Sequence, residues 1–248
     1  MDCKQVLRST DLVTGSPVWE KEFAPNSKGY IVNDNEVAVM QNDGTFTVLA
    51  LDDDQPKIES KVEPEPSLQS IFVTRSMDQY FLLANRPRQP NTDDVIQPVP
   101  PGYNPAWVNA KVYAFDKKTG ESQWEQPAEI NDFGFPLDQP SESPFLLFMR
   151  HRTPRTGNNR KPRTSVACIN KKDGSLAFFN DSIDTSTHMY SVIARPEKNE
   201  VVLMLPGKSF TLAYTAESGP PEPRAYVGQI ATKATTTTTT VKRAIPLP

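Results

Sequence analysis

One string of residues recurs along this chain at nearly constant offsets. Its fullest copy runs from Lys111 to Trp124, with an alternating strand, Asp116, a turn that contains Thr119 and Gly120, and a second strand that carries the tryptophan. A repeat of this kind limits the fold strongly, because each copy is one small unit that must stack on its neighbours to bury its apolar face.

Further copies of the string lie on both sides of the first. A weak copy at residues 46–52 keeps the strand and the aspartate, and another at 210–214 keeps the strand. Counted between positions 11, 52, 116, 170 and 214, the copies are 41, 64, 54 and 44 residues apart, close to the length of a four-stranded propeller blade with loops added. The best-preserved positions are Asp11, Thr14, Gly15 and Trp19 near the start, and Asn170, Gly174 and Phe178 in a third copy at 164–178.

The residue types of the motif have structural reasons. The aspartate can accept hydrogen bonds from backbone amides of the turn that follows, and glycine takes the positive φ that closes a hairpin. The aromatic side chain fills the gap between adjacent sheets. The motif therefore predicts a stack of sheets and contains no catalytic group.

The rest of the chain agrees with an all-β fold. Its 24 prolines and 11 glycines are spread along the whole length, and no segment has a sustained helical period. Short β-branched and aromatic runs lie between turn residues instead. The clearest predicted strands are Glu36–Met40, Thr45–Ala50, Gln79–Ala84, Pro144–Met149 and Glu200–Leu205.

The pattern Ala-x-Asp-x-x-Thr-Gly-x-x-x-Trp is complete from Ala114 to Trp124 and nearly complete from Ser9 to Trp19. It resembles the repeat of PQQ-like β-propellers, over roughly residues 5 to 216. The resemblance implies an all-β propeller of four-stranded antiparallel blades. In that family the motif occupies the last two strands of each blade, so Val6 to Phe23 is expected to be the second half of a blade.

The resemblance also implies an incomplete ring, since family members typically close seven or eight blades and about four and a half are found here. We expect blades over residues 1–228 and a Thr-rich flexible tail over 229–248, which contains an unbroken run from Thr235 to Thr240. A closing strand is the alternative for the tail, because threonine favours strands. The chain is expected to be part of a larger protein, and the family alone suggests the cell envelope or periplasm.

Two classes of function fit such blades. The first is a non-catalytic scaffold whose loops bind other proteins, since blades position loops and loops carry recognition. The second is a quinoprotein dehydrogenase with pyrroloquinoline quinone and calcium, which the family resemblance implies. The only cysteines are Cys3 and Cys168, so the chain lacks the adjacent cysteine pair on which many of those enzymes stack the quinone. A module of a larger cell-envelope protein remains a third reading. We expect a scaffold without a cofactor.

The residues offer little for catalysis or metal binding. The two histidines, His151 and His188, lie on separate repeats without a neighbouring cysteine or second histidine. Asp52 to Asp54 lacks the alternating ligands of a calcium loop. A formal charge of −3 does not mark a nucleic-acid binder, and no apolar run approaches the roughly 20 residues that span a bilayer. We therefore predict no catalytic and no metal residue.

Two loops are candidates for interaction with proteins. The stretch from Arg86 to Trp107 is rich in proline and is expected to be a stiff, extended insertion. It contains Pro100, Pro101 and Tyr103 in the form recognised by WW domains. The second loop is an expected hairpin turn that could hold a phosphate or an acidic partner, although a solvated loop is the simpler alternative. Its cations are Arg150, Arg152, Arg155, Arg160, Lys161 and Arg163.

Overall fold

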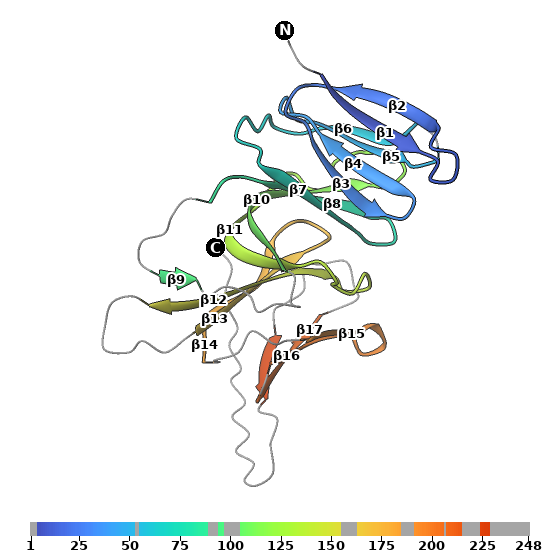
Figure 1. Cartoon of the computed structure of the whole chain (residues 1–248). Helices are drawn as coiled ribbons and strands as arrows, with labels where there is room; N and C mark the ends of the chain where they lie inside the picture. The colour runs from blue at the N-terminus through green and yellow to red at the C-terminus, as the bar shows by residue number, and fades with distance from the viewer. Residues whose placement is uncertain are drawn as a thin grey trace. The chain divides into compact units, whose positions relative to one another are not determined.

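The computed structural model describes residues 4–52, 55–88, 94–96, 105–154, 163–184, 191–205, 207–214 and 224–228. Within these ranges the chain is built from strands joined by turns, with one short 3-10 segment, Pro196–Lys198, and no α-helix (Figure 1). The chain divides into two compact units, Met1–Arg88 with Val108–Asn131, and Gln89–Trp107 with Asp132–Pro248. We call these unit 1 and unit 2 and describe each separately.

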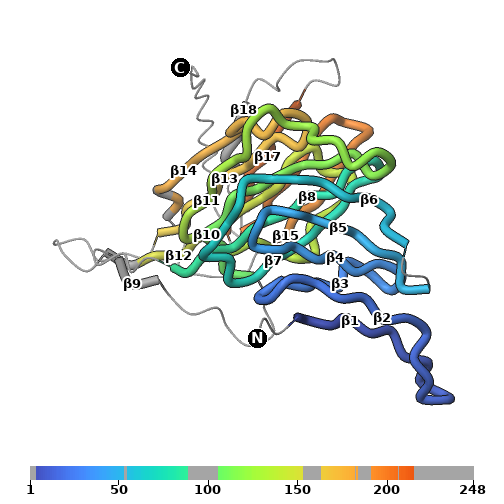
Figure 2. The backbone as a smooth tube through the Cα atoms, turned by 90° about the horizontal axis from the view of Figure 1, so that it is seen from above, coloured from blue at the N-terminus to red at the C-terminus, as the bar shows by residue number. Residues whose placement is uncertain are grey.

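Unit 1 contains three groups of antiparallel strands. Strands β1 (Gln5–Thr10) and β2 (Pro17–Phe23) form a two-stranded sheet. A four-stranded sheet follows in chain order, made of β3 (Lys28–Asn33), β4 (Glu36–Met40), β5 (Thr45–Ala50) and β6 (Pro56–Lys61). The third group is β7 (Ser70–Arg75), β8 (Gln79–Asn85) and β10 (Pro105–Asp116), paired in that order. Figure 2 shows β1 and β2 beside the sheet β3–β6.

Unit 2 repeats the same meander. Strand β11 (Ala128–Pro136) pairs with β12 (Phe145–Pro154), which pairs with β13 (Arg163–Asn170) and then β14 (Leu176–Asp184). Short strand β9 (Asp94–Ile96) adds to the far end of β12. A second sheet has the order β15 (Ser191–Arg195), β16 (Glu200–Leu205), β17 (Lys208–Ala213) and β18 (Arg224–Gly228).

These sheets confirm the predicted fold class, all-β with four-stranded antiparallel sheets. The predicted strands Glu36–Met40, Thr45–Ala50 and Glu200–Leu205 have the observed bounds. The segment from Val6 to Phe23 lies in the two-stranded antiparallel sheet β1–β2, and its assignment as half of a blade stays a prediction. The sheet count fits an incomplete ring.

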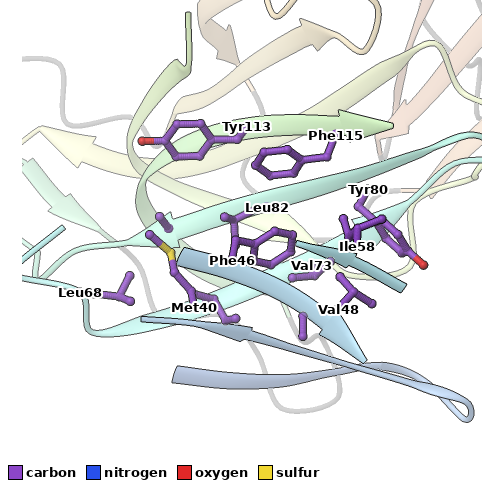
Figure 3. Close-up of a cluster of buried hydrophobic side chains, with 13 residues drawn as sticks. Met40, Phe46, Val48, Ile58, Leu68, Val73, Tyr80, Leu82, Tyr113 and Phe115 are labelled. Atoms are coloured by element: carbon purple, nitrogen blue, oxygen red, sulfur yellow. The ribbon is translucent and has the colours of Figure 1, made fainter. Parts of the chain in front are cut away.

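Each unit has its own core between stacked sheets. In unit 1 one cluster joins alternate residues of β4 and β5, such as Met40, Phe46 and Val48, to residues of β7, β8 and β10 (Figure 3). The rings of Phe46 and Phe115 stack with centroids 5.2 Å apart. The other face of β4 and β5 packs against Trp19 and Phe23 of β2. In unit 2 the face of β12–β14 packs on β16 and β17. Both faces of the inner strands are thus buried, which explains their nearly unbroken apolar sequences.

Two local predictions need correction. Trp124 is not in a regular second strand: one bridge, Phe115 to Ser122, and the bond from Gln123 N to Ala114 O hold that segment beside β10. The insertion from Arg86 to Trp107 is shorter than predicted, because β10 already starts at Pro105, where a strand needs no N–H. Strand β9, which pairs with β12, also lies inside that insertion.

Candidate functional site

Three copies of the motif turn share the same hydrogen-bonded geometry. Asp11 Oδ1 accepts hydrogen bonds from the amides of Val13 at 2.7 Å and Thr14 at 2.9 Å. Asp116 Oδ1 accepts the equivalent pair from Lys118 and Thr119, at 2.8 and 2.9 Å, and Asn170 accepts from Lys172 at 3.0 Å. The amide bonds lower the pKa of the Asp11 and Asp116 carboxyl groups. The turn glycines Gly15, Gly120 and Gly174 have φ values of +71°, +75° and +77°.

The motif aromatics lie against neighbouring strands. Trp19 packs on Val37, Val39 and Leu49, and its Nε1 donates to Leu51 O at 3.1 Å. Trp124 is 5% exposed, with its ring 5.9 Å from that of Phe81. Phe178 belongs to the core cluster of unit 2. These side chains act in packing, as their place in the repeat predicts.

The turns after five strands of unit 1 lie at one end of its sheets. Ser9 Oγ donates to Leu51 O, and Leu51 N donates to Asn35 O, so the turns after β1, β3 and β5 are linked. Tyr80 bonds Glu36, and Lys117 N donates to Asp78 O at 2.9 Å, which adds the turns after β7 and β10. We call this the turn end of unit 1.

Large apolar side chains stand exposed at the turn end. Leu12 is 98% exposed and Val13 is 94% exposed, both in the Asp11 turn, and Met77 in the β7–β8 turn is 91% exposed. Sequence reasoning singled out the Asp11 turn for its structure and overlooked the two apolar residues inside it. The signal was present, since turn positions between an aspartate and a glycine usually carry polar residues.

A buried carboxylate at the same end joins two sheets. Glu36 is 5% exposed and accepts hydrogen bonds from Tyr80 Oη at 2.9 Å, Lys57 Nζ at 2.9 Å and Asn33 Nδ2 at 2.6 Å. Arg75 lies 3.7 Å away. Burial alone would raise the pKa of Glu36, but these donors outweigh it and lower the pKa. Burial and the carboxylate together raise the pKa of Tyr80. Every oxygen of the group is occupied, so the network serves structure.

Replacing Glu36 by glutamine should therefore weaken the protein in a pH-dependent way. A lowered folded-state pKa stabilises the fold above the unfolded value of 4.5, and that contribution disappears as pH falls through the folded value. We expect Glu36→Gln to lower the free energy of unfolding by about 2 kcal/mol at pH 7. Urea denaturation at pH 7 and pH 3 measures this. The difference from the parent should shrink at pH 3. Glu125→Gln, at an exposed glutamate, is the matched control, and an equal loss in both variants would contradict the assignment.

The arginine cluster is placed differently from the prediction. Arg150 and Arg152 lie on β12 and Arg163 on β13, rather than in a hairpin loop. The guanidinium of Arg150 stacks 4.6 Å from the centre of the Phe133 ring, and Arg152 lies 3.6 Å from a carboxylate oxygen of Asp181. Their long apolar stems let arginines extend a strand while the charged heads find partners. Arg163 is directly opposite Arg152 in the sheet.

Several predicted residues lie outside the described part of the chain. They are Pro100, Pro101 and Tyr103 of the proline-rich loop, Arg155, Arg160 and Lys161 of the arginine cluster, and residues 229–248 of the tail.

Cys168 and Lys171 are buried titratable groups in the described part of unit 2. Cys168 is 1% exposed in the core, where burial raises the pKa of its thiol. Lys171, in the third motif turn, is 7% exposed, and burial lowers its pKa to about 8, while its Nζ donates to Ser141 O at 3.1 Å.

Within the described ranges no three His, Cys, Asp or Glu side chains form a group that could hold a metal ion.

In the same described part, no helix has the length and apolar character to cross a membrane.

Comparison with known families finds no matching family, and no curated protein matches the chain. Solved structures do match. A quinohemoprotein alcohol dehydrogenase from Comamonas testosteroni is 12% identical over 84% of this chain and 38% of its own, with a TM-score of 0.39. BamB from Moraxella catarrhalis is 9% identical over 90% of this chain and 88% of its own, with a TM-score of 0.29. The C-terminal WD40 domain of Sif2 is 10% identical over 84% of this chain and 61% of its own, with a TM-score of 0.33.

The chain spans well under half the length of the dehydrogenase it matches. The fold class rests on the strand registers of the chain itself.

Proposed function

We propose that this protein is a non-catalytic repeat scaffold that binds another protein through the turn end of unit 1. The observation that carries the proposal is the exposure of Leu12 and Val13, at 98% and 94%. Two adjacent apolar side chains that stand almost fully in water favour association, because covering them removes apolar surface from solvent. No cofactor takes part in this role.

The shape of the turn supports the proposal. The two amide bonds to Asp11 and the bond from Gly15 N to Asp11 O at 2.8 Å hold the backbone of the Leu12–Val13 tip in one conformation. A pre-ordered tip loses little conformational entropy on binding, so more of the contact energy appears as affinity. Met77, on another turn of the same end, adds a second apolar point. The rigid sheets below position both.

Photo-crosslinking in an extract of the cells that express the protein tests the proposal. A photoreactive amino acid in place of Val13 should crosslink a defined partner, while one in place of the exposed Glu125 should not. The Leu12→Ser variant should bind the purified partner at least tenfold more weakly than the parent. Its melting temperature should not change, because Leu12 is exposed. The proposal fails if the photoreactive group at position 13 crosslinks no partner, or crosslinks the same proteins as the group at position 125. It also fails if Leu12→Ser leaves the affinity for the partner unchanged.

A further inference from the structure

A stretch of unit 2 carries positive charge without any carboxylate of its own. Residues 150–163 contain five arginines and one lysine, and neither aspartate nor glutamate. Three of the arginines, Arg150, Arg152 and Arg163, belong to the paired strands β12 and β13. Like charges directly opposite each other in a sheet are destabilising, so this part of the sheet calls for an anion.

The register of β12 and β13 puts these arginines on one face. Arg152 is directly opposite Arg163, and Arg150 is directly opposite Ser165. Successive side chains of a strand alternate between faces, so residues two apart share a face. Arg150, Arg152, Arg163 and Ser165 therefore form four neighbouring positions on the same face of the sheet. We call these four residues the arginine block.

The side chain of Arg152 crosses the arginine block. Its Nη2 lies 3.4 Å from the main-chain oxygen of Asp181 and 3.6 Å from a carboxylate oxygen of the same residue. Asp181 belongs to β14, on the far side of β13. The guanidinium of Arg152 therefore passes over β13, the strand that carries Arg163 and Ser165. The Asp181 side chain is 54% exposed, so this contact lies at a rim that is open to water.

Two polar groups of the arginine block have no partner among the described residues. Ser165 is fully buried, and its hydroxyl makes no hydrogen bond there. Buried hydroxyl groups nearly always have a partner, because an unpaired one costs free energy. No hydrogen bond or ion pair with a described side chain engages the guanidinium of the half-buried Arg163. A hydroxyl and a cation without partners, beside a second cation, mark a place that an anion fits.

We propose that the arginine block binds a phosphate monoester dianion, with Arg152, Arg163 and the Ser165 hydroxyl donating to its oxygens. A guanidinium presents N–H donors in a planar fork that matches phosphate oxygens. The dianion balances both opposed arginines, whereas the single carboxylate of Asp181 balances one. Arg150, whose guanidinium stacks 4.6 Å from the centre of the Phe133 ring, adds a fixed positive charge. The site uses no residue of the turn end.

Isothermal titration calorimetry of the full chain with inorganic phosphate tests the proposal, with ionic strength held constant by sodium chloride. We expect saturable binding and a melting temperature that rises with phosphate concentration. Arg163→Gln should weaken binding roughly tenfold or more, because hydrogen bonds to a charged group are lost. Arg163→Lys keeps the charge without the fork and should give an intermediate affinity. Arg195→Gln removes the same charge from β15 and should leave the affinity unchanged.

Ser165→Ala separates binding from structure. Without phosphate, removing a hydroxyl that bonds nothing should leave the free energy of unfolding unchanged. The affinity for phosphate should nevertheless fall. A loss of stability together with unchanged affinity would show that the hydroxyl serves the fold, and would overturn its place in the site.

A carboxylate of the chain itself is the competing occupant. Asp184 is directly opposite Arg163 on β14. If Asp184 compensated Arg163, then Arg163→Gln and Asp184→Asn would lose the same free energy of unfolding and phosphate would not bind, which would overturn the proposal. Chloride that competes as well as phosphate would reduce the effect to charge screening and would overturn it too.

The source of the phosphate is resolved with two further probes. Glycerol 3-phosphate carries the monoester in solution, and phosphatidylcholine vesicles with phosphatidic acid carry it on a membrane. Binding of the first alone assigns a soluble ligand, and tighter binding of the vesicles assigns a lipid headgroup. Either result supports the site, and neither depends on the crosslinking partner of Val13.

Discussion

The Trp124→Ala protein is expected to unfold with a free energy about 3–5 kcal/mol below that of the parent, since truncating a buried tryptophan removes its transfer energy and leaves a cavity. Trp124 is 5% exposed and contacts the fully buried Phe81. Its segment lies beside β10 through the bridge between Phe115 and Ser122 and the hydrogen bonds from Gln123 N to Ala114 O and from Asp116 N to Glu121 O. Urea denaturation followed by circular dichroism measures the change.

Trp124→Phe is the matched control. Phe178 occupies the equivalent position of the third copy and is buried there, which shows that the repeat accommodates the smaller ring. We expect the phenylalanine variant to lose about 1.5 kcal/mol, because part of the volume is kept. If the alanine variant melted like the parent, the packing role of the motif aromatic would be wrong.

The second large effect is expected at Gly44, in the turn between β4 and β5. Its φ is +88°, and a Cβ built there would lie 2.2 Å from the carbonyl oxygen of Val62 and 3.1 Å from the carbonyl carbon of Glu63. Val62 N also donates to Gly44 O at 2.9 Å, so the two backbones cannot separate without losing a hydrogen bond. Gly44→Ala combines left-handed strain with a backbone clash, and we expect a loss of about 3 kcal/mol or more.

Two other glycines separate strain from crowding. Gly15 has a similar φ of +71° and nothing within 4 Å of its built Cβ, so Gly15→Ala should cost only the strain, about 1 kcal/mol. Gly120 has a φ of +75°, and a Cβ built there would lie 3.1 Å from Glu59 O and 3.2 Å from Ile58 Cβ. The loss of stability in Gly120→Ala should therefore lie between those of Gly15→Ala and Gly44→Ala. Thermal and urea denaturation of the three alanine variants give the order. Equal losses in all three would show that crowding contributes nothing.

Much of the fold could be predicted because its signals are local. A strand alternates every second residue, and the Asp-to-Gly turn closes within five residues, so Glu36–Met40 and the motif turns were readable from the sequence. Strand β12 extends to Pro154, beyond the predicted end at Met149, because pairing with β13 and β9 continues past the apolar run. Arg150 and Arg152 of this strand were predicted to lie in a loop because they follow the apolar run.

The candidate sites depended on contacts between distant residues. The bond between Tyr80 and Glu36 joins positions 44 residues apart, and no short-range pattern marks either side chain as buried and charged. The exposure of Ile31 likewise follows from which strands stack on β3, since the alternating sequence of that strand is the same whether its outer face is covered or bare. The sequence marks Gly44 only as a turn glycine, because the close approach of the Val62 backbone depends on the tertiary structure.

By itself the sequence determined the repeat, the all-β class and the motif turns, because backbone conformation and turn hydrogen bonds are set by neighbouring residues. Only the tertiary structure decided which apolar side chains are buried and which remain in water. Burial is a property of the stacked sheets, and identical strands become core or surface according to what packs on them.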